Sequence, residues 1–474
     1  MKSYQLVVIG AGSGGLVAAE IAAKLGARVA LVEAKPNLGG ECLNSGCVPS
    51  KALIHAARLA ASLRQGERFG VKAKVEVDFA SVMAHVRRSI QQIEDRSDND
   101  ARYQSLGVDM YHGPVRFTGR TKITSGDVTI RAKRFIIATG SSPLVPQIEG
   151  LDDAKYLTNE NIFELKKLPK RLAVIGGGPI GCELGQAMSM LGSQVSIINN
   201  ADRLLPREEP ESSAALAASF QAQAIQVISN AKVEMVQAGS GGLAVRYRVG
   251  DQMQQLLVDQ VLVATGRQAH TDLDLDRAGV TVGKRGIEVN GRLETSAKHI
   301  YAIGDCTGGP QFTHIAAEHA GVAVQNALFG RRATADLKVI PWVTFTTPEI
   351  AHLGQTEAEV AKANTPHRAY RLDYHEIDKA VTEGEAGFIK VVAGQDNRIL
   401  GASVVGAGAG ELLAQINLAF YNGLKVADFA KTIQAYPTYS LGLKEMAGRD
   451  RLERLVSGWK GKLVKAYLRS RLGS

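Results

Sequence analysis

Two cysteines with four residues between them carry the most specific chemistry in this sequence. Cys42 and Cys47 lie in the segment 39–51, Gly-Gly-Glu-Cys-Leu-Asn-Ser-Gly-Cys-Val-Pro-Ser-Lys. Thiols at this spacing can close a small disulfide ring that stores two electrons and releases them again. Pro49 favours the first turn of a helix, so we expect Cys47 near a helix N-terminus, with Lys51 as a nearby cation. Both features lower a thiol pKa, and the pair is therefore predicted to be redox-active rather than buried and inert.

A glycine-rich turn shortly before this pair predicts a first dinucleotide site. The apolar strand 6–9 is followed by Gly10, Gly12 and Gly15, and the next strand ends in Glu33. Gly10 makes the tight turn, Gly12 lets the backbone approach a pyrophosphate, and Gly15 lets the following helix pack on the strand. The carboxylate of Glu33 is placed to accept hydrogen bonds from ribose hydroxyls. Strand, turn, helix, strand and acid occur in the order that the motif requires.

The same pattern recurs in the middle of the chain and predicts a second dinucleotide site. The apolar strand 172–175 precedes three glycines with the same spacing, Gly176, Gly178 and Gly181. The position equivalent to the acid of the first site is Asn199, which lacks the negative charge that usually favours NAD over NADP. The sequence therefore leaves NADH and NADPH both open.

Two dinucleotide sites in one chain predict hydride transfer between their ligands. Ala-Thr-Gly ends an apolar strand after each fingerprint, at residues 138–140, which include Thr139 and Gly140, and at 264–266, which end in Gly266. Asp305 directly follows a third buried strand, where its carboxylate could bind a polyol chain.

With these motifs the chain resembles the class I pyridine nucleotide-disulfide oxidoreductases, which include dihydrolipoyl dehydrogenase and the catalytic core of mercuric reductase. The resemblance implies an α/β fold with two Rossmann-like dinucleotide-binding domains, for FAD and for NAD(P)H, and a C-terminal α+β dimerisation domain. The implied divisions are an FAD domain at 1–144, an NAD(P)H domain at 145–270, a central domain at 271–338 and an interface domain at 339–474. It also implies a homodimer whose active sites use residues of both subunits.

The resemblance also implies individual roles. Cys47 would be the thiol next to the flavin and Cys42 the thiol that meets substrate, while Lys51 would lie at the flavin and pair with Glu183. The implied FAD-binding residues are Gly10, Gly12, Gly15, Glu33, Gly40, Lys51, Thr139, Gly140, Asp305, His314 and Ala316. The implied NAD(P)H-binding residues are Gly176, Gly178, Gly181, Asn199 and Gly266.

The chain departs from the family at its proton-transfer residue. Disulfide-reducing members carry His-Pro-Thr-x-x-Glu near the C-terminus, whereas this chain has Tyr436 and Leu441 at the two key positions and no histidine after His375. A tyrosine titrates near 10 and a histidine near 6.5, so a phenol is a poor general base at neutral pH. The acceptor is therefore expected to be a soft metal ion, an unusual disulfide or a protein partner. The alternative is a quinone or dye reductase of the diaphorase type.

The C-terminal segment predicts a basic amphipathic helix. Six apolar residues recur at three- and four-residue steps and form one helical face: Leu452, Leu455, Val456, Trp459, Leu463 and Tyr467. Arginines and lysines surround them, while Gly458 and Gly461 weaken the helix. Such a helix can lie on an anionic membrane or a partner, which would make the chain a membrane-docked, redox-sensing subunit, or it can pack on the dimer with its basic face in water.

Composition restricts the remaining possibilities. The 474 residues are enough for three or four domains, and the formal net charge of +9 is mild and comes without a nucleic-acid-binding motif. The other two cysteines, Cys182 and Cys306, are isolated and expected to pack in the core. Few cysteines with one close pair suit a reducing compartment, so we expect a cytoplasmic protein. No residues predict a resident metal ion. A sheet of the interface domain is expected to start at residues 378–380.

Overall fold

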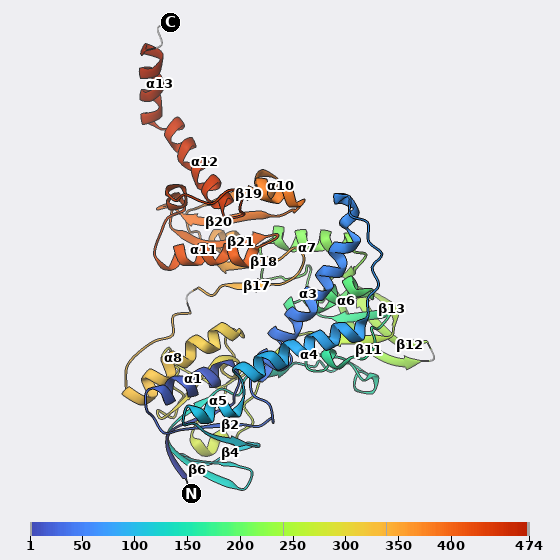
Figure 1. The fold of residues 1–474 in the computed structure, drawn as a ribbon, viewed down its shortest axis with the longest axis vertical. Helices are drawn as coiled ribbons and strands as arrows, with labels where there is room; N and C mark the ends of the chain where they lie inside the picture. Colours follow the sequence, from blue (N-terminus) through green and yellow to red (C-terminus); the bar gives the residue numbers. More distant parts are fainter. Residues whose placement is uncertain (1, 240, 338, 472–474) are drawn as a thin grey trace. The chain divides into compact units, whose positions relative to one another are not determined.

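A computed structural model describes residues 2–239, 241–337 and 339–471. Its backbone forms two compact units (Figure 1). The first contains residues up to 198 and residues 231–336, and the second contains residues 199–230 and those from 337 onward. The four-part division at 1–144, 145–270, 271–338 and 339–474 stays a prediction, and its limits at residues 1, 338 and 474 lie outside the described residues.

The first unit is built on a sheet of seven strands. Its order is β3-β2-β1-β6-β5-β4, with β16 also pairing with β6. The strands are β1 (Lys2–Ile9), β2 (Val29–Glu33), β3 (Asp109–His112), β4 (Val115–Gly119), β5 (Lys122–Ser125), β6 (Val128–Ile137) and β16 (Ile300–Ala302). Successive side chains of β1 enter different cores, with Val7 and Ile9 in one and Leu6 and Val8 in the other. Both faces of β1 are covered, which explains its continuous apolar run.

Helices α1 (Ser13–Lys24) and α8 (Thr313–Phe329) pack together in one of these cores (Figure 1). The redox segment forms α2 (Gly40–Asn44) and α3 (Cys47–Arg64), and the chain continues through α4 (Phe79–Arg96) and α5 (Asp100–Ser105). The predicted helix start at Cys47 is confirmed.

A second parallel sheet of the first unit contains the second fingerprint. Strand β8 (Arg171–Ile175) lies between β9 (Gln194–Ile198) and β14 (Gln260–Val263), and α6 (Pro179–Leu191) connects β8 to β9. An antiparallel sheet of β11 (Ala231–Gly239), β12 (Gly242–Val249) and β13 (Gln252–Val258) belongs to the same unit, as does the pair β7 (Ser141–Pro143) and β15 (Arg267–Ala269).

The second unit contains a five-stranded sheet in the order β17-β18-β21-β20-β19. Its strands are β17 (Trp342–Thr344), β18 (Ile350–Gly354), β19 (His367–Asp373), β20 (Phe388–Gly394) and β21 (Ile399–Val405). The unit also contains the short strand β10 (Gln226–Ile228). Its helices are α7 (Pro210–Ala222), α9 (Glu357–Lys362), α10 (Asp378–Glu383), α11 (Ala409–Tyr421), α12 (Leu441–Ser457) and α13 (Trp459–Arg471). Among the described residues, no helix is long and apolar enough to cross a membrane.

The expectation of a sheet start at residues 378–380 was wrong, because these residues open α10. An acidic residue in the first turn, here Asp378, favours a helix N-terminus, and Gly384 ends the helix in the left-handed conformation with φ +64°.

A buried lysine holds three acidic residues together in the second unit. Lys390 on β20 is 5% exposed, and its Nζ lies 3.2 Å from Glu209, 3.0 Å from Glu211 and 2.7 Å from Glu357. Glu209 is itself only 3% exposed. The lysine charge therefore compensates the buried carboxylate of Glu209 and also pairs with the partly exposed Glu211 on α7 and Glu357 on α9.

Replacing Lys390 by methionine should destabilise the second unit by about 3–5 kcal/mol, because a buried carboxylate loses its counter-charge. Urea unfolding followed by tryptophan fluorescence measures the change. Lys431→Met is the matched control, since Lys431 is 70% exposed in its pair with Asp428 and should cost less than about 1 kcal/mol. Equal stability of the two variants would contradict this role of the cluster.

Candidate active site

The first glycine fingerprint forms a backbone cradle at the start of α1. Gly10 has φ +100°, and a Cβ there would collide with the carbonyl of Ala138. A Cβ at Gly15 would collide with the carbonyl of Gly10. Gly12 precedes the helix, and no side chain caps the helix at this position. The free amides of the first turn are therefore available to a pyrophosphate, as the motif predicts.

The redox segment lies directly against this cradle. Gly40 has φ +56°, and a Cβ there would come within 2.7 Å of the Gly12 Cα. The Glu33 carboxylate stabilises the turn, because it accepts hydrogen bonds from the Ala11 amide at 2.6 Å and from the Lys35 amide at 2.9 Å. A dinucleotide bound on α1 would consequently lie next to the residues that lead into the cysteine pair.

The other predicted FAD-binding residues follow the strand ends of the same unit. Thr139 and Gly140 connect β6 to β7, Asp305 lies in the short turn after β16, and His314 and Ala316 are in the first turn of α8. The Asp305 carboxylate accepts a hydrogen bond from the Ser141 hydroxyl at 2.6 Å. The imidazole of His314 is exposed and stacks on Phe312, with ring centroids 5.3 Å apart.

Cys42 and Cys47 face each other across the break between α2 and α3. Both are free thiols and they share a hydrogen bond. This bond, together with Thr313 and Lys51, lowers the pKa of Cys47 to about 6. The same bond and burial raise the pKa of Cys42. Cys47 is therefore the thiolate of the pair at neutral pH, and Cys42 keeps its proton.

Lys51 lies one helical turn after Cys47 and pairs with Glu183 of α6. The two atoms Nζ and Oε2 are 2.7 Å apart, and the glutamate is 8% exposed. This pairing, which the sequence predicted, fixes a cation beside the redox pair.

An ion pair that the sequence analysis missed holds the redox segment from the other side. The guanidinium of Arg267 binds both carboxylate oxygens of Glu41, the residue before Cys42. Arg267 is 10% exposed, and its Nε also donates to the Ser141 hydroxyl at 2.9 Å. Asn159 donates to the same carboxylate at 2.8 Å. In the sequence this contact is indicated only by position, because Arg267 directly follows the second Ala-Thr-Gly and Glu41 directly precedes Cys42.

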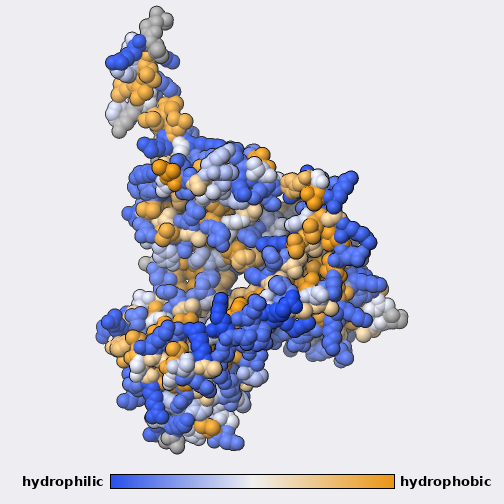
Figure 2. Space-filling view, viewed as in Figure 1, coloured by the Kyte–Doolittle hydropathy of each residue, from blue (hydrophilic) through white to orange (hydrophobic). Residues whose placement is uncertain are grey.

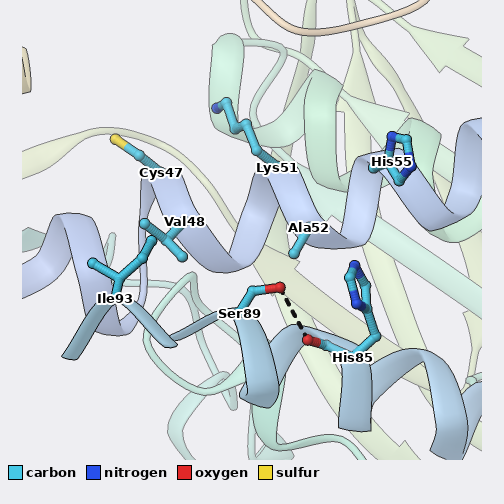
Figure 3. A pocket seen from close by; sticks show the side chains of 8 residues that line it. All are labelled: Cys47, Val48, Lys51, Ala52, His55, His85, Ser89 and Ile93. Atoms are coloured by element: carbon cyan, nitrogen blue, oxygen red, sulfur yellow. Dashed lines mark hydrogen bonds between the residues drawn. The ribbon is translucent and has the colours of Figure 1, made fainter. Parts of the chain in front are cut away.

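An open pocket of about 430 Å³ runs between α3 and α4 beside Cys47 (Figure 3). Cys47, Lys51 and His55 follow one another at four-residue steps along α3. His85 and Ser89 face them from α4, and the Ser89 hydroxyl donates to the His85 carbonyl at 3.1 Å. Cys47 is exposed, and with Lys51 it lines one side of this open space.

The second fingerprint repeats the geometry of the first. Gly176 has φ +116°, and a Cβ at Gly181 would collide with the Gly176 carbonyl. Helix α6 begins after Gly178 without a side-chain cap, and Gly266, with φ +142°, ends the loop after β14.

Asn199 belongs to the second unit, where its amide donates to the carbonyls of Ala201 at 3.2 Å and Arg203 at 2.7 Å. These contacts hold the loop after the position where an acid would bind ribose. They do not decide between NADH and NADPH.

Tyr436 also lies in the second unit, where it is 70% exposed. Its hydroxyl donates to Asp378 at 2.9 Å, and this hydrogen bond raises the pKa of the phenol. The contact moves Tyr436 further from the range of a neutral-pH base. Leu441, which stands where the family has glutamate, opens α12.

The isolated cysteines are buried, as expected. Burial raises the pKa of Cys306 to about 11 and also raises the pKa of Cys182, so both remain thiols. Within the part of the chain that the structure describes, no three histidine, cysteine or acidic residues are grouped to hold a metal ion.

Comparison with known proteins identifies the class. Residues 4–320 match the sequence signature of the pyridine nucleotide-disulphide oxidoreductases, and residues 340–447 match the dimerisation domain of the same proteins. The chain therefore belongs to the pyridine nucleotide-disulphide oxidoreductase family. It is an FAD-dependent NAD(P)H oxidoreductase with a redox-active cysteine pair, and its dimerisation domain supports a homodimer.

Individual relatives confirm this class and the predicted α/β architecture. Mercuric reductase of Lysinibacillus sphaericus is 36% identical over 447 residues, covering 93% of this chain and 82% of that protein. Dihydrolipoyl dehydrogenase of Thermus scotoductus is 38% identical over 453 residues, covering 94% and 97%. The Cu(II) complex of the HOCl-induced flavoprotein disulfide reductase RclA from Escherichia coli has a TM-score of 0.86 at 28% identity, covering 95% of this chain and 100% of that one.

Removing the hydroxyl next to Cys47 should raise the pKa of this thiol. The Thr313 Oγ1 lies 3.3 Å from the Cys47 Sγ and stabilises the thiolate. In Thr313→Val the midpoint of thiolate formation should move up from about 6 by about one pH unit. The rate of alkylation by iodoacetamide as a function of pH, in reduced enzyme, measures it. Thr313→Ser keeps the hydroxyl and should titrate like the parent, and a valine variant with an unchanged midpoint would refute the contact.

Proposed function

We propose that this enzyme passes an electron pair from NAD(P)H through FAD to Cys42 and Cys47, and from the dithiol to a soft metal ion. The observation that carries the proposal is the combination of a preformed thiolate with a missing base. Cys47 has a pKa of about 6, whereas Tyr436, which replaces the family's histidine, has a raised pKa. A metal ion binds thiolates directly, whereas a disulfide substrate also needs an acid/base that handles the proton of its thiol.

The residues of the site supply each requirement of this reaction. FAD held by the glycine cradle at the start of α1 would supply the chemistry that takes a hydride from NAD(P)H and delivers two electrons to the cysteine pair. Lys51 and the N-terminus of α3 stabilise the thiolate of Cys47. Cys42 loses its proton when the metal binds, because a coordinated thiol is a thiolate.

The electrons and protons of the metal step balance. Because Cys47 is already a thiolate, one proton leaves to water, from Cys42; an S–S bond forms between Cys42 and Cys47, and two electrons go to the metal. They reduce either one Hg(II) to Hg(0) or two Cu(II) to two Cu(I). The relatives named mercuric reductase and the Cu(II) complex of RclA support this class of acceptor.

A second candidate function is direct reduction of a quinone or dye by the flavin, with the dithiol dispensable. An unusual disulfide or a protein partner is the remaining acceptor class for the dithiol itself. The exposure of Cys47 and the pocket beside it are compatible with each of these acceptors.

Cys42→Ser separates the two routes. If the dithiol is the relay, this variant should lose at least about 100-fold in NAD(P)H-dependent Cu(II) reduction, because one of the two electron-carrying sulfurs is gone. Formation of Cu(I) is followed with a chromogenic chelator, with NADH and NADPH run separately. Cys182→Ser is the matched control, since Cys182 is buried and isolated, and it should keep parental turnover. Full Cu(II) turnover by Cys42→Ser would contradict the dithiol relay and would support direct transfer of electrons from the flavin to the acceptor.

Restoring the family's acid/base pair should recover disulfide chemistry. Tyr436→His with Leu441→Glu should raise dihydrolipoamide oxidation by about 10²-fold or more, because a positioned base contributes this much. Steady-state rates with NAD, compared as kcat/KM, measure the gain. Tyr436→Phe, which removes the hydroxyl without adding a base, should show no gain. High parental activity with dihydrolipoamide would refute the proposed loss of this function.

We also propose a cytoplasmic enzyme that contacts a membrane peripherally through its C-terminal segment. The segment from Arg449 is basic, and its apolar side chains are exposed. Docking would not change the chemistry at Cys42 and Cys47, but it would place the enzyme at a surface, as in a redox-sensing subunit.

A further inference from the structure

The C-terminal segment after residue 450 leaves the core of the second unit. Leu443, Met446 and Ala447 on the first half of α12 are buried in the core. Asp450 is 3% exposed and lies 2.7 Å from Arg368, which also pairs with Glu453 at 3.1 Å. The second half of α12 and α13 then project away from the sheet of this unit (Figure 1).

This projecting part exposes a continuous set of large apolar side chains. Trp459 is 69% exposed, Leu463 60% and Tyr467 55%. The space-filling view shows apolar surface gathered over the end of α12 and over α13 (Figure 2). The other exposed apolar residues are Leu452, Leu455, Val456, Val464 and Leu468. Exposed apolar patches of this kind mark an interaction surface.

Three basic residues of α13 are displaced from its apolar residues, whereas the positions of Lys460 and Arg471 fall on the apolar side, and the Arg471 guanidinium lies 5.3 Å from the Tyr467 ring centroid. Trp459, Leu463 and Tyr467 follow at four-residue steps, whereas Lys462, Lys465 and Arg469 follow at steps of three and four. At about 100° per residue the two sets lie on opposite faces of a helix about 20 Å long. No acidic residue occurs between Gly458 and the end of the chain.

Gly461 holds the bend between the two helices. It is buried, and a Cβ there would collide with the carbonyls of Leu455 and Val456 at the end of α12. This close packing fixes the bend between α12 and α13, and the exposed apolar side chains of the two helices lie on either side of it.

We infer that α13 is a docking element for an anionic lipid surface. The inference rests on the peripheral contact proposed above and names its partner. The apolar face would enter the interface with Trp459 and Tyr467, the residue types that favour this depth, while lysines and arginines meet the anionic headgroups.

Two observations favour lipid over a second copy of the chain. The matched dimerisation domain ends at residue 447, before the projecting part begins. Residues 458–474 carry positive charges and no acidic residue, so this segment would be repelled by the same segment of a second copy. An anionic bilayer offers both apolar depth and negative charge.

Vesicle sedimentation of the FAD-loaded full chain tests the inference. The parent should bind vesicles of phosphatidylglycerol and phosphatidylcholine in equal parts about tenfold or more tightly than pure phosphatidylcholine, and it should lose this binding at high salt. Lys462→Glu with Lys465→Glu and Arg469→Glu should abolish it. The matched control carries the same charge change on an exposed loop of the first unit, Lys166→Glu with Lys167→Glu and Lys170→Glu, and should still bind.

A chain ending at Ser457 removes α13 but keeps the ion pairs of α12, and it should also lose vesicle binding. NAD(P)H-driven dye reduction by the tail variants should equal that of the parent, so the vesicle result is independent of the metal acceptor proposed above. Equal binding to both vesicle types, binding retained after truncation, or a change from dimer to monomer on truncation in sedimentation equilibrium would overturn the inference.

Discussion

The buried ion pair between Glu41 and Arg267 is the contact on which the geometry of the redox segment depends. It joins the residue before Cys42 to the strand pair β7–β15 and, through Ser141, to Asp305. Arg267 is 10% exposed and Glu41 28% exposed, and burial raises the pKa of Glu41 to about 7 although the arginine opposes this shift. One arginine therefore aligns the cysteine segment with the loops that surround the first dinucleotide cradle, and a small shift of it would misplace the thiols.

The two thiols of the pair differ in their electrostatics, because the pKa of Cys47 is lowered and that of Cys42 is raised. The α3 N-terminus, Lys51 and Thr313 act on Cys47, whereas Cys42 is held as a thiol. The pair thus presents one ready nucleophile and one proton-carrying partner. A family member that reduces disulfides adds a base for the substrate proton. In this chain the corresponding residue is Tyr436 of the second unit, whose phenol is hydrogen-bonded to Asp378.

The two halves of α12 illustrate how one helix can serve two purposes. Its first half contributes Leu443 and Met446 to the core of the second unit and is tied by the Arg368–Asp450 pair. Its second half and α13 contribute apolar side chains to the surface instead. Burial stabilises the first half, whereas the exposed part gains from burial only when a partner covers it. The dimerisation domain and the exposed segment are therefore adjacent in sequence, but only the first is stabilised by burial in the core of the unit.

The sequence by itself determined both glycine fingerprints, the cysteine pair, the helix start at Cys47 and the replacement of histidine by Tyr436. These are local patterns whose chemistry depends on residue type and short spacing. Only the tertiary structure decided which distant residues act on them. Arg267 lies 226 residues from Glu41, and Thr313 lies 266 residues from Cys47. It also decided that residues 378–380 open a helix and that the apolar face of α13 stays exposed. Contacts between residues so far apart leave no periodic pattern in the sequence, because the packing of whole helices and strands brings the residues together.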